Sequence, residues 1–138
     1  MKNKRIVIKL SGEVMEQGNQ EANLDFGKIM KLADSLKKLA KQGYQIGVVL
    51  GGGNIFRARM VKNMEIDREV ADHIGMTATM INAMALQAVL SKMKQAAKVL
   101  SPFVIPATMS AYSASRANSY LNKKHIVIFA AGTGKPYF

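Results

Sequence analysis

Short apolar runs alternate along the chain with longer segments whose apolar residues recur every three or four positions. The short runs predict strands at residues 5–10, 44–50, 99–105 and 126–131, with Pro102 interrupting the third. The longer segments predict helices at residues 25–41, 67–91 and 113–122. The resulting order βαβαβαβ predicts an α/β protein, with a mostly parallel sheet flanked by helices.

Local signals place the ends and faces of these helices. Asp25 is a candidate N-cap for the first helix, and Gly43 suits its C-terminal end. Residues 11–24 are polar and predict a loop. The helix at 67–91 carries an apolar stripe at helical spacing, formed by Val70, Ile74, Ala78, Ile81, Ala85 and Ala88.

Three predicted strands end in small residues with free backbone N–H groups. The first runs into Lys9-Leu10-Ser11-Gly12, the second into Gly51-Gly52-Gly53-Asn54, and the last into Gly132-Thr133-Gly134-Lys135-Pro136. In an open α/β sheet such loops meet in the crevice outside the carboxyl ends of the strands. Backbone N–H groups and cationic side chains suit phosphate, so the pattern predicts a phosphate-handling site.

Each of these features also has a reading without a ligand. The glycine triplet forms either a close approach to phosphate, with Arg57 as a clamp and Arg59 pointing elsewhere, or a tight turn alone. Lys9 is either a phosphate ligand or an ordinary solvated lysine. Asp72 and His73 are adjacent on a helix and therefore do not share a face, so an Asp–His catalytic dyad is not predicted.

Charge is distributed unevenly along the 138 residues. The formal net charge is +11, yet every Asp and Glu lies at or before Asp72. This distribution indicates either a nucleic-acid-binding surface or a stretch of a larger protein whose remainder carries the acids. The chain has no cysteine, which fits a cytoplasmic protein, and we expect no apolar run near the roughly 20 residues that span a bilayer.

Taken together, the motifs resemble those of bacterial UMP kinases in the amino acid kinase family. The matching stretches are Lys9 to Glu13, Val48 to Arg57, Ala71 to Met76 with Ala78-Thr79, and Ala130 to Gly134 with Pro136-Tyr137-Phe138. The resemblance runs along the whole chain and is weakest between Leu90 and Tyr120. It implies the amino acid kinase α/β/α sandwich, of which residues 1–138 would form the N-terminal, UMP-side portion with the C-terminal half absent.

The resemblance implies phosphoryl transfer from ATP to UMP, giving UDP, with Mg²⁺ accompanying ATP. Lys9 and Arg57 would be catalytic, and ATP would be bound by Lys9, Ser11, Gly12, Gly53 and Arg57. UMP would be bound by Gly52, Asp72, Thr133, Gly134, Lys135, Pro136, Tyr137 and Phe138. No residue of this stretch would ligate metal. Such a division of work suits a reaction that depends on positioning and charge neutralisation.

The resemblance has one departure and leaves competing functions open. Lys135 stands where the family usually has Asn, which affects the expected nucleotide contacts at that point. A homohexamer in the cytoplasm, activated by GTP and inhibited by UTP, is also implied, without membrane or nucleic-acid partners. The alternatives are a phosphate- or nucleotide-binding module without turnover and, less favoured for want of an aromatic stacking platform, a basic nucleic-acid-binding protein.

Overall fold

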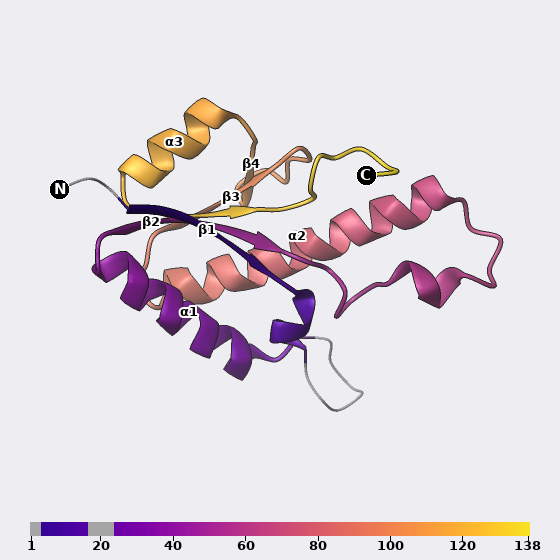
Figure 1. Ribbon diagram of the computed structural model, residues 1–138, viewed down its shortest axis with the longest axis horizontal. Helices are drawn as coiled ribbons and strands as arrows, with labels where there is room; N and C mark the ends of the chain where they lie inside the picture. Colours follow the sequence, from indigo (N-terminus) through magenta and orange to yellow (C-terminus); the bar gives the residue numbers. More distant parts are fainter. Residues whose placement is uncertain (1–3, 17–23) are drawn as a thin grey trace.

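The computed structural model describes residues 4–16 and 24–138, and Figure 1 shows their arrangement. The strands are β1 (Lys4–Leu10), β2 (Tyr44–Leu50), β3 (Ala97–Ser101), β4 (Met109–Ala111) and β5 (Ile126–Phe129). The helices are α1 (Phe26–Lys41), α2 (Arg68–Lys92) and α3 (Ala114–Asn122), with the short 3-10 helices η1 (Gly12–Met15) and η2 (Ala58–Val61). The predicted alternation of strands and helices is confirmed.

The strands form one sheet in the order β1-β2-β5-β3-β4, and every strand pair is parallel. Helices α1 and α2 cover one face and α3 covers the other (Figure 1). The larger core lies under α1 and α2 and includes Ile46, Leu86 and Ile128, while Leu121 and Val127 belong to a smaller core under α3. The predicted α/β sandwich with a parallel sheet is therefore confirmed.

Three boundaries differ from the prediction. β3 ends at Ser101, because Pro102 has no N–H to donate to a neighbouring strand. The separate strand β4 was not predicted, since three residues are too few to show an alternating pattern. β5 ends at Phe129, because Ala131 has a left-handed backbone with φ 60° and turns the chain out of the sheet.

The ends of α1 follow the sequence signals. The Asp25 carboxylate accepts a hydrogen bond from the Lys28 N–H at 3.1 Å, as expected of an N-cap. Gly43 adopts φ 89° just after the helix, where a residue without Cβ is favoured. In the predicted loop, η1 begins after Ser11, whose hydroxyl caps it, and residues 17–23 lie outside the described part of the chain.

The predicted apolar stripe of α2 is only partly its buried face. Ala78 and Ala85 are buried, but Val70, Ile74 and Ile81 are exposed, and the core contacts come instead from residues such as Leu86 and Leu90. The helix is apolar around much of its circumference, which hides the true face from periodicity.

This apolarity also corrects the expectation about bilayer-length segments. Within the described residues, α2 is the one helix long and apolar enough to cross a membrane by length and composition, with a mean hydropathy of 1.3 over its most apolar window. The helix packs against the sheet and α1, and 39% of that window is buried.

Candidate phosphate-binding site

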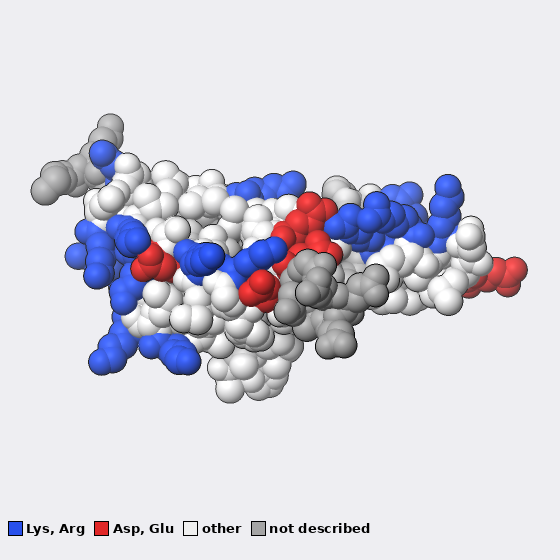
Figure 2. Space-filling model, turned by 90° about the horizontal axis from the view of Figure 1, so that it is seen from below, with Lys and Arg blue, Asp and Glu red and all other residues white. Residues whose placement is uncertain are grey.

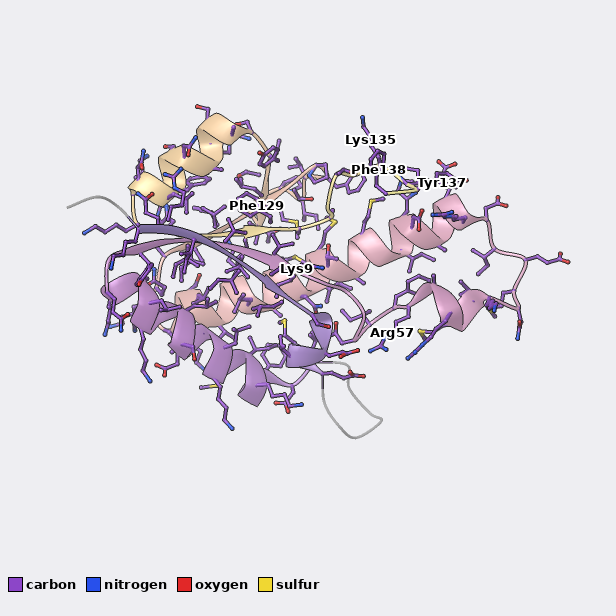
Figure 3. The ribbon with its side chains drawn as sticks, viewed as in Figure 1. Lys9, Arg57, Phe129, Lys135, Tyr137 and Phe138 are labelled. Atoms are coloured by element: carbon purple, nitrogen blue, oxygen red, sulfur yellow. The ribbon has the colours of Figure 1, made fainter. Side chains whose placement is uncertain are left out.

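The three predicted loops lie at one edge of the sheet because the strands that lead into them are neighbours. β2 lies between β1 and β5 in the sheet, and all three strands run in the same direction. Their carboxyl ends therefore open onto one edge, as the sequence predicts. Figure 3 shows Lys9 on β1, Arg57 in the segment after β2, and Tyr137 in the C-terminal segment beside α2.

The loops after β1 and β2 are in direct contact. The Gly51 N–H donates to the Leu10 carbonyl at 2.9 Å. A Cβ added at Gly12 would lie 2.4 Å from Asn54 Oδ1 and 3.0 Å from the Gly53 N, closer than such atoms can approach. Gly12 is buried, so a residue without a side chain is required here by the neighbouring loop, whether or not a ligand binds.

Two buried asparagines, Asn54 in the loop after β2 and Asn82 in α2, stabilise this contact. Asn82 of α2 donates through Nδ2 to the Gly51 carbonyl at 2.7 Å and to Asn54 Oδ1 at 2.7 Å. Asn54 Nδ2 donates in return to Asn82 Oδ1 at 3.1 Å. Asn82 is fully buried, and a buried amide is tolerated only when its polar atoms find partners.

Gly52 and Gly53 have different surroundings, so an added side chain would have a different effect at each position. A Cβ at Gly52 would lie 2.8 Å from the Ala78 Cβ and 3.0 Å from the backbone N of Thr79, so Gly52 lets the loop rest on α2. A Cβ at Gly53 would meet only the Arg57 side chain, at 3.5 Å, which is an ordinary contact. Gly53 is thus the member of the triplet at which a small side chain would fit without a clash.

Arg57 lies beside Gly53 and is held by two acceptors. Its Nε donates to the Gly53 carbonyl at 2.6 Å, and its guanidinium pairs with the Glu13 carboxylate at 2.5 Å. These bonds orient the side chain and leave further N–H donors of the guanidinium for a ligand. Arg59 does not point elsewhere as expected, because both arginines line one cavity of about 260 Å³ together with Gly53.

Lys9 and Ser11 occupy the exposed side of the β1 loop. Lys9 is solvent-exposed on the edge strand. The Ser11 hydroxyl is also exposed and accepts a hydrogen bond from the Glu13 N–H at 3.4 Å. Both side chains are therefore accessible to a ligand at the edge of the sheet.

The loop after β5 begins with two left-handed residues. Ala131 has φ 60° and Gly132 has φ 52°. For an alanine this conformation costs on the order of 1–3 kcal/mol and persists where the surroundings hold it. Here the Ala131 N–H donates to the hydroxyl oxygen of Thr79 in α2 at 2.7 Å. The loop borders a second cavity of about 260 Å³, which Phe129, Gly132 and Tyr112 help to line.

Asp72 and the segment 133–138, both predicted on the UMP side, are brought together. Asp72 Oδ2 accepts a hydrogen bond from the Tyr137 N–H at 2.7 Å and lies 3.8 Å from the Arg68 Nε. The Arg68 guanidinium also lies 4.9 Å from the centre of the Tyr137 ring. Gly134 contacts Pro102, whereas Thr133, Lys135, Tyr137 and Phe138 are exposed. Pro136 is half-buried.

The two histidines have different surroundings. His73 contacts the Glu69 carbonyl through Nδ1 at 2.7 Å and lies beside the Phe103 ring, away from the Asp72 hydrogen bond. His125 precedes β5, and its buried Nδ1 has no partner. Among residues 4–16 and 24–138, no group of three or more His, Asp or Glu side chains could hold a metal ion.

The sequence reasoning missed two residues of α2 that contact the loops. Thr79 bonds the loop after β5, and Asn82 bonds the loop after β2. Thr79 lies in one of the stretches that match the family, but the sequence predicts no role for it or for Asn82. The signal that could have found them is a polar residue, three positions from another, inside an otherwise apolar helix.

Glycine-rich loops at the carboxyl edge of a parallel sheet, with cations beside them, characterise α/β domains that bind phosphate-containing ligands. The model of the amino acid kinase family matches residues 4–136. The chain therefore belongs to the amino acid kinase family.

The chain is similar to several uridylate kinases. The chain is 41% identical to that of Ureaplasma parvum over 100% of its own length and 58% of the relative's, and 39% identical to that of Bartonella bacilliformis over 98% and 56%. Its fold is similar to the crystal structure of UMP kinase from Ureaplasma parvum, with a TM-score of 0.93 over 58% of that chain, and to that of Bacillus anthracis, with 0.90 over 55%. The chain thus spans little more than half the length of these relatives and corresponds to their N-terminal portion.

Proposed function

We propose that this chain provides the UMP-side portion of a UMP kinase, which transfers a phosphoryl group from ATP to UMP. The observation that carries the proposal is the meeting of three loops at one edge of the sheet, from the neighbouring strands β1, β2 and β5. The similarity to uridylate kinases over 98–100% of the chain supports the choice of nucleotide.

In the proposed reaction the loops after β1 and β2 bind the phosphates. Exposed Lys9 and the Arg57 guanidinium neutralise charge on the group in transfer, while the backbone beside Gly53 approaches it closely. The Glu13 and Gly53 contacts hold Arg57 in place before the ligand arrives. Such preorganised positive charge is the main contribution that a protein makes to phosphoryl transfer.

The proposed UMP side combines Gly52, Asp72 and the segment from Thr133 to Phe138. Asp72 already accepts the Tyr137 N–H, so nucleotide binding at this carboxylate would involve the same loop. Mg²⁺ would be carried by the ATP phosphates, as is usual for this metal. Cytoplasmic location, homohexamer formation, GTP activation and UTP inhibition remain predictions of the resemblance.

Titration calorimetry with UMP and with ATP, combined with a coupled assay for ADP formation, tests the proposal. UMP binding with turnover supports the kinase. UMP binding without turnover fits both a nucleotide-binding module and a kinase portion that is inactive by itself, and turnover after the C-terminal part of a uridylate kinase is added would distinguish the two. Binding of neither nucleotide contradicts both. A salt-dependent RNA titration addresses the basic protein alternative. Figure 2 favours the first two, because on the face it shows the basic side chains form separate groups with acidic side chains between them.

A further inference from the structure

One face of α2 contacts both the loop after β2 and the loop after β5. Asp72, Thr79 and Asn82 are separated by seven and three residues, so their side chains leave the helix on the same side. Asp72 bonds the Tyr137 N–H, Thr79 bonds the Ala131 N–H, and Asn82 bonds the Gly51 carbonyl. A single rigid helix thus holds segments that lie far apart in the sequence.

The amide of Asn82 is oriented by its partners. Both N–H donors are used, one on the Gly51 carbonyl and one on Asn54 Oδ1. Exchanging the oxygen and nitrogen of this amide would bring Oδ1 against the Gly51 carbonyl, two acceptors facing one another. Because the group is fully buried, no bulk solvent is available to replace a lost partner.

Thr79 supports Ala131, one of the two non-glycine residues with a left-handed backbone in the loop after β5. Its hydroxyl donates to the Met76 carbonyl at 2.7 Å, which leaves the oxygen lone pairs directed at the Ala131 N–H. Ala131 is the non-glycine residue that turns the chain out of the sheet with φ 60°. Serine could make both bonds, whereas valine has the same shape and can make neither.

We propose that Thr79 and Asn82 are positioning residues. Thr79 sets the loop after β5, and Asn82 sets the loop after β2 and, through Asn54, its contact with Gly12. Neither side chain needs to touch a ligand, since each acts on the backbone that does. The inference rests on the proposed function for the identity of the ligands, but the loop geometry that it describes does not.

Backbone amide exchange measured by NMR tests the loop geometry without any ligand. Thr79→Val should speed exchange of the Ala131 amide about 3- to 10-fold, the factor for loss of one hydrogen bond, and leave the Gly51 amide unchanged. Asn82→Leu removes the donor to the Gly51 carbonyl. It should speed exchange of the Gly51 amide, which donates to the Leu10 carbonyl, and leave the Ala131 amide unchanged. Thr79→Ser is the matched control and should keep wild-type exchange at Ala131. Unchanged exchange at Ala131 in Thr79→Val, or equal loss at both loops in both variants, would overturn the proposal.

Calorimetry then tests the consequence for binding. Thr79→Val should weaken UMP binding about 3- to 10-fold and leave ATP binding within about twofold, with Thr79→Ser restoring UMP affinity. If Thr79→Val does not fold, Thr79→Ala replaces it in both measurements. Normal UMP affinity despite faster exchange at Ala131 would also overturn the proposal. If wild-type protein binds neither nucleotide, the proposed function fails while the exchange result still decides the positioning role.

Discussion

The loops after β1 and β2 differ from the loop after β5 in how they are held. The first two contact one another closely at Gly12 and rest on the buried pair Asn54 and Asn82. The third leaves the sheet at Ala131, and most of its residues are exposed. Two hydrogen bonds to α2, at Thr79 and Asp72, connect it to the rest of the fold.

This difference suits two kinds of work. A cradle for phosphate gains from rigidity, because charge stabilisation requires groups that are already in place. A segment that surrounds a substrate must open and close, and such segments have few buried contacts. We therefore expect the first pair of loops to be preformed and the third to change on binding UMP.

The largest expected effect comes from a side chain at Gly52. Gly52→Val would force the added atoms against the Ala78 Cβ and the α2 backbone, so it should destabilise the fold by about 1–3 kcal/mol or more. Gly53→Ala is the matched control, because its Cβ meets only an ordinary contact with Arg57. It should preserve the melting temperature while weakening ATP binding. Equal melting temperatures for both variants would contradict the close contact between this loop and α2.

Arg57→Ala should weaken nucleotide binding by about 1.5–3 kcal/mol, the cost of losing a charged hydrogen bond. Its effect on folding should be no more than about 1 kcal/mol, since the pair with Glu13 is partly exposed. Arg59→Ala is the comparison. Arg59 lines the same cavity. Within the described residues, no hydrogen bond or ion pair orients its side chain. Calorimetry with ATP should show the smaller loss for Arg59→Ala, and equal losses would remove the assignment to Arg57.

Much of this comparison could be predicted from the sequence. Strand runs followed by glycine and lysine predict loops at one edge of a parallel sheet, and the three loops do meet there. The asymmetry between the loops could not be predicted, because it depends on contacts between residues distant in the chain. Asn82 looks like an isolated polar residue until the fold places it beneath Gly51.

The helix α2 shows why the buried face was assigned wrongly. Apolar residues surround most of it, so Ile74 and Ile81 fit the helical period as well as Leu86 and Leu90 do. Periodicity identifies a face only when the opposite face is polar. The glycines show a related limit, since Gly52 and Gly53 are adjacent in sequence, yet a Cβ would clash with α2 at Gly52 and would make only an ordinary contact with Arg57 at Gly53.

A smaller effect is expected at the connection between α2 and the third loop. Asp72→Ala removes the acceptor for the Tyr137 N–H, which should cost about 0.5–1.5 kcal/mol of local stability and weaken UMP binding. Faster amide exchange at Tyr137 would be the direct sign. Arg68→Ala is the control, because it removes the ring contact with Tyr137 while leaving that hydrogen bond intact. Exchange at Tyr137 that responds to Arg68→Ala alone would show that the ring contact holds the loop.

The smallest effect concerns His125, at the end of β5 opposite the loop. Burial lowers the pKa of His125 below its ordinary value of 6.5, and the charges of Lys98 and Lys123 lower it further. The folded state therefore resists protonation more than the unfolded state does. The stability contribution is fully present above pH 6.5, falls as the pH drops below 6.5, and is lost once the pH has passed through the folded pKa.

His125→Phe isolates this pH-dependent contribution to stability. The His125 and Tyr120 ring centres lie 5.6 Å apart, and phenylalanine keeps a ring at this place but does not titrate. Denaturation in urea from about pH 8 to about pH 5 should show wild-type protein losing stability relative to the variant as the pH falls. UMP affinity at pH 8 should be the same in both, since Ala131 and its bond to Thr79 lie at the other end of the strand. A pH-independent difference in stability would show that His125 is not the titrating group. A change in UMP affinity would show that the loop after β5 depends on the whole strand as well as on α2.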